Sequence, residues 1–203
     1  MKTEQILTKV LEILENGCNR SGVENLADLL KGEMMNETAK ANGRLSAKRA
    51  ADRLIKSSRE HRPEWGAFDF ENKQYIGGAY SFVVLNDPLP VEQMGKVENF
   101  HDDFYAKLWS DAQKHEYKNI DFDFSGFKKW LKIQKAEHKA RKDKSCICYD
   151  FGEDLPQVNA DFLTDIIAIL GGDAKVKVAR PIDPVLFESE RGEGHLLPVR
   201  KER

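Results

Sequence analysis

The change of hydrophobic periodicity over the last part of the sequence constrains the fold more than any other feature. SCICYDF, at residues 145–151, predicts a strand. Asn159 is a good helix N-cap, and apolar residues follow it at helical spacing as far as the helix-stopping pair Gly171–Gly172. AKVKVA then alternates Lys with Val, which predicts a strand with one solvent-exposed face. PVLFESE and HLLPVR, joined by the turn ERGEG, predict two more strands, so residues 145–203 are expected to form a β-α-β-β-β unit.

The preceding sequence changes character after Pro63. Residues 1–62 carry apolar residues at helical spacing and predict an N-terminal helical extension. The run WGAFDFENKQYIGGAYSFVVL is aromatic and β-branched, with a turn at Glu71–Lys73, and predicts a hairpin whose second strand bends at Gly77–Gly78. A basic helix with few inward-facing apolar residues is predicted from Phe127 to Lys144.

These patterns together predict an α+β fold. A β-α-β-β-β unit alone leaves one sheet face and one edge uncovered, so it needs a second unit to bury them. Residues 64–144 contain strands and a helix of suitable size. We therefore expect a single domain over residues 64–203, with two halves packed sheet to sheet and helices on one side, preceded by the extension over residues 1–62. The final strand is expected to close the sheet of that domain.

The composition favours a soluble protein of a reducing compartment. Charged residues make up 33% of the 203 residues, and no apolar run approaches the roughly 20 residues that span a bilayer. The N-terminal stripe is broken by charges and lacks the apolar core of a signal peptide. The three cysteines do not indicate a disulfide framework. We expect a cytoplasmic protein without a membrane partner.

Basic residues are concentrated in two predicted helices, although the formal net charge is only −2. The sequence between them, from Glu64 to Asp123, is acidic. Such segregated charge is typical of a DNA-facing surface, whereas the plainer interpretation of each basic run is a solvated helix face. The basic residues of the first helix are Lys40, Arg44, Lys48, Arg49, Arg53, Lys56, Arg59 and Arg62. Those of the second are Lys128, Lys129, Lys132, Lys135, Lys139, Arg141, Lys142 and Lys144.

Three segments of the C-terminal unit carry a resemblance to a known family: VNADFLTDIIAILGG, AKVKVA and PVLFESERGEGHLLPVR. In their order, spacing and terminal position they resemble half of a domain of the bacterial sliding clamp, the β subunit of DNA polymerase III. The final clamp domain has a helix with a similar N-x-x-(F/Y)-L-x-D opening, three strands and a terminal apolar–apolar–Pro–apolar–Arg string. The resemblance covers residues 145–203 and is weaker over 64–144, where the hairpin and the basic helix look like the other half-domain.

The chain departs from the clamp pattern in its length and at its N-terminal end. A bacterial clamp has three such domains per chain and closes a ring with two chains, whereas this chain has room for one domain. Residues 1–62 resemble nothing in the clamp. The resemblance therefore implies a single clamp-type domain from a phage or mobile element, and a ring would need six copies, which the N-terminal helices could block.

The resemblance also implies two kinds of site. Basic helices of the clamp line the ring and touch DNA phosphates without reading sequence, and the C-terminal edge of the clamp accepts short apolar motifs of replication proteins. Ordinary strand packing is the alternative for the C-terminal edge. The DNA-contact candidates are Lys128, Lys129, Lys132, Lys135, Lys139, Arg141 and Lys142. The peptide-docking candidates are Leu197, Pro198, Val199 and Arg200.

No pattern in the sequence indicates catalysis, a metal or a cofactor. Nucleophile motifs and phosphate-binding glycine loops are absent. Cys146 and Cys148 do not have the usual spacing of a zinc site, and His101-Asp102-Asp103 is better explained as an exposed acidic turn. The sequence thus predicts a non-enzymatic, clamp-like module of DNA replication that binds DNA backbone, a replication protein or both. The alternative is a protein–protein adaptor that kept the clamp fold without encircling DNA.

Overall fold

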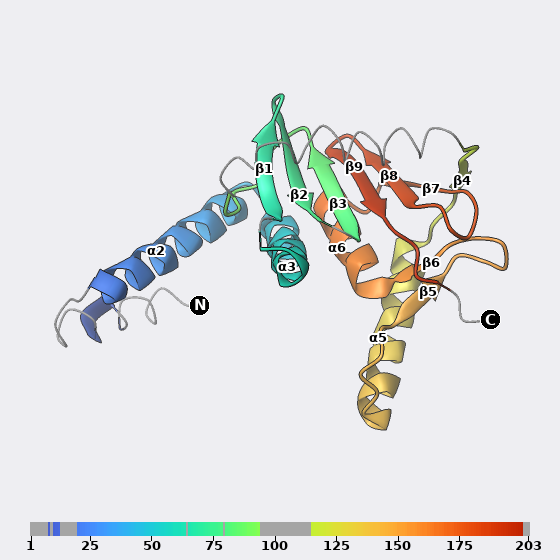
Figure 1. Cartoon of the computed structure of the whole chain (residues 1–203), viewed down its shortest axis with the longest axis horizontal. Coiled ribbons are helices and arrows are strands. Elements are labelled where there is room, and N and C mark those ends of the chain that lie inside the picture. Colours follow the sequence, from blue (N-terminus) through green and yellow to red (C-terminus); the bar gives the residue numbers. More distant parts are fainter. Residues whose placement is uncertain are drawn as a thin grey trace.

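A seven-stranded antiparallel sheet forms the frame of this computed structural model, and helices cover one of its faces (Figure 1). The structure describes residues 8, 10–12, 20–63, 65–78, 80–93 and 115–200. The predicted α+β class is confirmed by this sheet and its helices. None of the helices in the described ranges is long and apolar enough to cross a membrane.

The first half of the sheet is a meander that follows a helix. Helix α3 (Leu45–His61) precedes strands β1 (Gly66–Phe70), β2 (Lys73–Gly77) and β3 (Ser81–Leu85). The predicted hairpin is confirmed, because β1 and β2 pair across a turn in which Glu71 and Asn72 both have positive φ. The bend expected at Gly77–Gly78 is instead the end of β2, and β3 then returns beside it.

The second half has the element order that the sequence predicts, apart from one additional strand, Gln157–Asn159, directly before the helix. Strands β5 (Cys148–Asp150) and β6 (Gln157–Asn159) precede helix α6 (Ala160–Leu170), which is followed by β7 (Lys175–Val178), β8 (Val185–Ser189) and β9 (Gly192–Leu196). The Asn159 side chain caps α6 by accepting hydrogen bonds from the Asp161 and Phe162 backbone N–H groups, at 2.8 and 3.3 Å. Strands β5 and β6 pair with each other and form a separate small sheet.

The two halves meet edge to edge. The strand order is β1-β2-β3-β9-β8-β7-β4, with the short strand β4 (Lys118–Ile120) at the outer edge of β7. Strand β3 pairs with β9, with Ser81 opposite Leu196. Sheet-to-sheet packing of two halves was therefore the wrong expectation, because β9 pairs with β3 and makes one continuous sheet. Each half is an α-β-β-β unit, and the final strand of the second half lies in the middle of the sheet.

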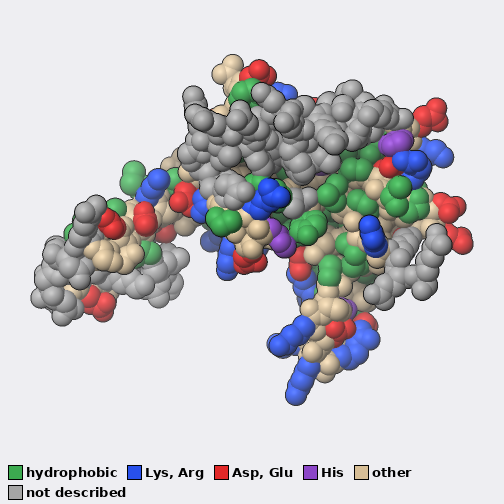
Figure 2. Space-filling model, in the orientation of Figure 1, with side chains coloured by type: hydrophobic (Ala, Val, Ile, Leu, Met, Phe, Trp, Pro, Cys, Tyr) green, Lys and Arg blue, Asp and Glu red, His purple; other side chains and the backbone are tan. Residues whose placement is uncertain are grey.

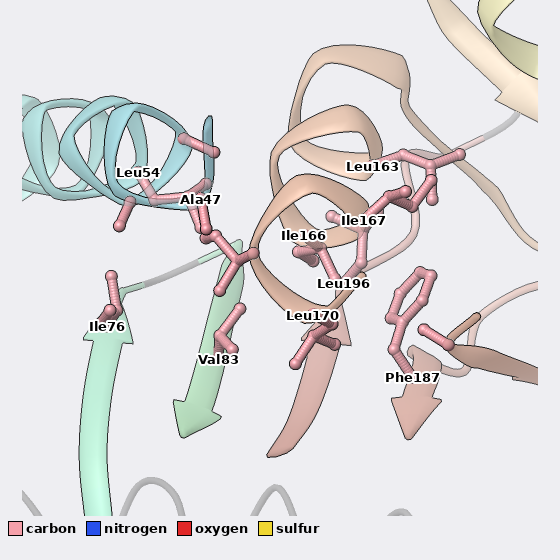
Figure 3. Packing of buried hydrophobic residues seen from close by; sticks show 14 of the residues in the cluster. Ala47, Leu54, Ile76, Val83, Leu163, Ile166, Ile167, Leu170, Phe187 and Leu196 are labelled. Atoms are coloured by element: carbon pink, nitrogen blue, oxygen red, sulfur yellow. The ribbon is translucent and has the colours of Figure 1, made fainter. Parts of the chain in front are cut away.

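The hydrophobic core lies between the sheet and two helices on the same face, α3 and α6. Figure 3 shows Ala47 and Leu54 of α3 and Ile166 and Leu170 of α6 directed toward the strands. A Cβ at Gly194 would lie only 2.9 Å from Ile166, so this glycine lets α6 approach β9 closely. The domain boundary after residue 62 remains a prediction, but α3, which precedes it, is part of this shared core. The core residues that α3 contributes are Ala47, Ala50, Ala51, Leu54 and Ile55.

Two helices project from the sheet and its covering helices (Figure 1). They are α2 (Arg20–Ala41) and α5 (Phe124–Arg141). The basic helix, α5, resembled the helix of the other half-domain in the sequence, but the helix that packs beside α6 on the sheet is α3. The sequence interpretation failed here because α5 buries only Phe127 and Leu131, whereas α3 buries a whole face.

Candidate nucleic-acid interface

Helix α5 is fixed at both ends and anchored at its base. The Ser125 and Gly126 backbone N–H groups donate to the Asp123 carboxylate, at 3.0 and 2.9 Å, and so cap the helix. Its first half is held by buried Phe127, which packs against the ring of Tyr149 with 5.1 Å between centroids. The helix ends at Lys142, which has left-handed backbone geometry. The capped and anchored helix therefore holds its basic residues out in solvent.

Four of the predicted lysines share one side of α5. Lys128, Lys132, Lys135 and Lys139 recur at intervals of four and three residues, and all four are exposed. The Lys135 Nζ atom lies 2.6 Å from Oδ1 of Asp161, in the first turn of α6. This ion pair shows that the lysine side of α5 faces the N-terminal end of α6.

The other predicted DNA-contact residues of α5 lie elsewhere on the helix. Lys129 is exposed and belongs to a different side of α5 from the four lysines that share a side. Arg141 is exposed and makes an ion pair of 3.5 Å with Glu137 of the same helix. Lys142 is exposed at the C-terminal cap, where a positive charge is favourable for the helix dipole.

Helix α3 brings a second basic row to α6. Arg49, Arg53 and Lys56 are spaced by one helical turn and are exposed. Arg53 donates from Nε and Nη2 to Oδ1 of Asp165, at 2.9 and 2.5 Å. The Asp165 side chain is only 8% exposed, and its burial raises its pKa despite the opposing effect of Arg53.

The two acidic residues of α6 therefore connect both basic helices to one face of the molecule. Asp161 and Asp165 lie one turn apart, and each binds a basic residue from a different neighbouring helix. We call this surface the three-helix face. It comprises Arg49, Arg53 and Lys56 of α3, Asp161 and Asp165 of α6, and Lys128, Lys132, Lys135 and Lys139 of α5.

Most of the positive charge on the three-helix face is free of counter-charge. Lys135 and Arg53 neutralise the two α6 carboxylates. Within the ranges that the structure describes, the remaining basic residues of the face make no ion pair: Arg49, Lys56, Lys128, Lys132 and Lys139. Figure 2 shows Lys and Arg side chains along the projecting α5. The face is therefore a positively charged surface with a neutralised centre.

The other basic residues predicted between residues 40 and 62 each have a partner outside the three-helix face. Arg44 binds Asp87 at 2.5 Å, Lys48 binds Asp52 at 2.7 Å, and Arg59 binds Glu92 at 2.9 Å. Lys40 is 3.5 Å from Glu37, and the Arg62 guanidinium lies over the ring of Trp65. Charge alone could not separate Arg44 and Arg59 from Arg49 and Lys56, because the partners of Arg44 and Arg59 are distant in sequence.

The predicted peptide-docking residues follow the last strand. The last strand was expected over HLLPVR, residues 195–200, but β9 spans Gly192–Leu196 and so includes three residues that were predicted as a turn. Leu197, Pro198, Val199 and Arg200 therefore lie outside the sheet. Their backbone is nevertheless fixed, because the Leu197 N–H donates to the Tyr80 carbonyl and the Val199 N–H to the Gln157 carbonyl, at 2.8 and 2.7 Å. Leu197, Pro198 and Val199 are half-buried, and Arg200 is exposed. A role in peptide docking remains a prediction.

The sequence did not predict the cleft between α2 and α3. The cleft has a volume of about 630 Å³, and its apolar floor includes Met35 and Ile55. Basic and acidic side chains also line it, among them the Lys48–Asp52 and Arg59–Glu92 pairs and Lys56 of the three-helix face. The sequence analysis placed α2 and α3 in the same N-terminal extension, but no motif in that extension indicated a cleft between them.

A polar cluster at the β4–β7 edge of the sheet has a structural explanation. Arg180 donates from its backbone N–H, Nε and Nη2 to the buried carboxylate of Asp183, and these hydrogen bonds lower the pKa of Asp183. Burial raises the pKa of nearby Tyr117 to about 12. Asp183 is thus held ionised and Tyr117 protonated. Neither pKa is tuned toward neutrality, as acid–base catalysis requires.

Metal ligation is not supported by the described part of the chain. No group of three His, Cys, Asp or Glu side chains there converges as a ligand set. The Sγ atoms of Cys146 and Cys148 lie 3.5 Å apart, so the structure brings these two thiols into contact. The sequence His101-Asp102-Asp103, for which an acidic turn was predicted, lies outside the described residues.

Comparison with protein-family models, with curated protein sequences and with solved structures finds no match to this chain.

Proposed function

We propose that this protein is a non-enzymatic, clamp-like module of DNA replication that binds the DNA backbone through the three-helix face. The observation that carries the proposal is the pair of contacts Arg53–Asp165 and Lys135–Asp161, which direct two basic helices toward one surface. Lysine and arginine side chains on exposed helices bind phosphate without regard to sequence.

The internal repeat supports the clamp part of the proposal. Two α-β-β-β units share one sheet, their last strands pair at its centre, and their helices lie side by side on one face. The clamp resemblance of residues 145–203 implies two half-domains of this kind. The helix of the first half would be α3, and α5 would be an addition that extends the basic surface.

The physical basis of binding is the release of counterions from DNA. Each phosphate that a lysine or arginine neutralises contributes about 0.9 to the slope of log affinity against log salt for duplex DNA. Arg49, Lys56, Lys128, Lys132 and Lys139 are exposed and free to contribute. We expect tight binding at low salt and steep weakening as salt rises.

The test is fluorescence-anisotropy titration of a labelled duplex over a salt series. The variant K128E/K132E/K139E reverses three exposed charges on α5, and R49E/K56E reverses two on α3. Both variants should bind at least about tenfold more weakly than the unmodified protein, with a shallower salt slope. None of the five residues makes a described ion pair or is buried, so folding should be retained.

The matched control is K73E/K118E/K175E, which makes the same change of net charge as the α5 variant. These three exposed lysines lie on strands β2, β4 and β7, away from the three-helix face. Equal loss of binding in this control would mean that net charge alone governs the interaction. Absence of binding to the unmodified protein at low salt would overturn the DNA proposal.

The cleft beside α2 favours the second candidate, a protein–protein adaptor. Helix α2 projects from the body with Val23, Leu30 and Met34 exposed, and it forms one wall of the cleft of about 630 Å³. Exposed apolar residues on a projecting helix are typical of a surface that another protein covers. A protein that fails to bind DNA but captures a replication protein would support this candidate.

A further inference from the structure

Two thiols lie in contact at the junction of α5 and α6. The Sγ atoms of Cys146 and Cys148 are 3.5 Å apart, with one residue between them in sequence. The Cys146 side chain is exposed and that of Cys148 is half-buried, so small molecules can reach the pair. The sulfurs would need to move about 1.5 Å closer to reach the roughly 2 Å length of a disulfide bond.

The residue between the two cysteines is attached to the start of α6. The Ile147 carbonyl accepts a hydrogen bond of 2.9 Å from the Ala160 N–H, the first residue of that helix. Ile147 also packs against the hydrophobic core. Asp161, which holds Lys135 of α5, is the next residue of α6. A change in the backbone conformation at Ile147 therefore affects the first turn of α6, which carries Asp161 of the three-helix face.

We propose that Cys146 and Cys148 are a reversible oxidative modification site, at which a low-molecular-weight disulfide closes an intramolecular disulfide bond and thereby weakens the three-helix face. The disulfide itself is independent of the proposed function. Its effect on DNA binding rests on that function. Disulfides with strained geometry are easily reduced and are the regulatory kind, which fits a bond between residues so close in an extended chain.

The chemistry consists of two thiol–disulfide exchanges. The thiolate of one cysteine attacks a sulfur of the small disulfide, forms a mixed disulfide and releases one small thiol. The second cysteine then loses its proton, attacks the protein sulfur of the mixed disulfide and releases the second small thiol. Two protein thiols are oxidised to one disulfide, and one small disulfide is reduced to two small thiols.

The environment of Cys146 determines the rate of disulfide formation. Although the residue is exposed, partial desolvation of its thiol raises its pKa to about 12, together with the neighbouring Cys148 thiol and Asp161. Cys146 therefore keeps its proton at neutral pH, and its step is slow there. Ring closure should become faster as pH rises, by about tenfold per pH unit while Cys146 deprotonation limits the rate.

The disulfide should act on the interface through the first turn of α6. Bringing the two sulfurs together bends the chain at Ile147, and the Ile147–Ala160 hydrogen bond must lengthen or turn. Asp161 then no longer holds Lys135 in its present position. The basic side chains of α5 are no longer aligned with those of α3 on the three-helix face. We expect oxidation to weaken duplex binding by about threefold or more, and reduction to restore it.

The experiment uses the full chain with Cys18→Ser, so that only the proposed pair can react. The protein is equilibrated with oxidised glutathione, digested with trypsin and examined by mass spectrometry. Cleavage after Lys144 and Lys175 leaves both cysteines in one peptide, in which the disulfide appears as a loss of two hydrogen atoms. Duplex binding is measured on the same samples before and after dithiothreitol. Cys146→Ser and Cys148→Ser are matched controls that cannot close the ring.

Each result separates the parts of the proposal. A peptide lacking two hydrogens, together with weaker binding that dithiothreitol reverses, supports it in full. Glutathione adducts without ring closure, or no reaction, overturn the modification site. Ring closure with unchanged duplex binding overturns the link to the three-helix face and leaves the proposed function standing. Ring closure in a protein that binds no DNA when reduced leaves the site standing and overturns the proposed function.

Discussion

At the scale of single residues, His195 is the clearest case of a titratable group confined in the sheet. It lies in β9, is 2% exposed, and its ring stacks on Phe82 with 4.5 Å between centroids. Burial lowers the pKa of His195 to about 3, from an ordinary value near 6.5. The folded protein therefore holds this imidazole neutral at pH values where the unfolded chain protonates it.

This residue predicts loss of stability in mild acid. Its folded pKa lies below the unfolded value, so its contribution is fully present above about pH 6.5 and is lost as the pH falls toward 3. The free energy of unfolding should fall by about 1.4 kcal/mol for each pH unit below 6.5. Urea unfolding of the unmodified protein and of His195→Gln between pH 7.5 and 4.5 provides the check. In the His195→Gln variant, the free energy of unfolding should fall less steeply with decreasing pH, by about 1.4 kcal/mol per pH unit. The same pH dependence in both proteins would contradict the prediction.

At the scale of elements, the spacing of apolar residues predicted which side of a helix is buried. It did not predict which other elements that side packs against. The apolar stripe of α6 and the Lys–Val alternation of β7 were sufficient to place those elements, because each carries a strong and regular pattern. The role of α3 in the core was missed, because small residues such as Ala47 and Ala50 do not by themselves indicate a buried helix face. Their burial becomes clear only when the sheet and α6 are seen to pack against them. The three-helix face was only half predicted, because Arg53–Asp165 joins residues far apart in sequence.

The cap of α6 gives a prediction for one element. Asn159→Ala removes the acceptor for the Asp161 and Phe162 N–H groups and should lower the free energy of unfolding by about 1 kcal/mol. Asn159→Asp keeps an acceptor oxygen at the same place and should remain close to the unmodified protein. Chemical denaturation of the three proteins compares them directly. Equal stability of the alanine variant would show that the cap contributes little.

At the scale of the whole molecule, the two α-β-β-β units depend on one core. Helix α3 covers strands β1 and β2, and α6 covers β3, β9 and β8, while the two helices pack against each other. Leu54 of α3 and Leu163 of α6 are both fully buried in the same cluster. Neither half buries its apolar surface alone, so the molecule should unfold as a unit.

Truncation tests this dependence and the domain boundary together. A protein that starts at residue 43 keeps α3 and should give a cooperative thermal transition by circular dichroism. A protein that starts at residue 64 lacks α3, exposes the sheet residues that Leu54 and Ile55 cover, and should show no cooperative transition. A cooperative transition in the shorter protein would instead establish residues 64–203 as an autonomous domain.

The central position of β9 has a consequence for synthesis of the chain. On the ribosome, β9 is the last of the described strands to emerge, yet it alone joins the β1–β2–β3 meander to β8 and β7. Until it emerges, the nascent protein exposes open strand edges on both β3 and β8, which are sites where another chain can pair. Pairing of Ser81 with Leu196 also closes a very long loop, which slows folding. The interval between translation of β3 and release of β9 is thus the period in which this protein is most exposed to misassembly and would gain most from a chaperone.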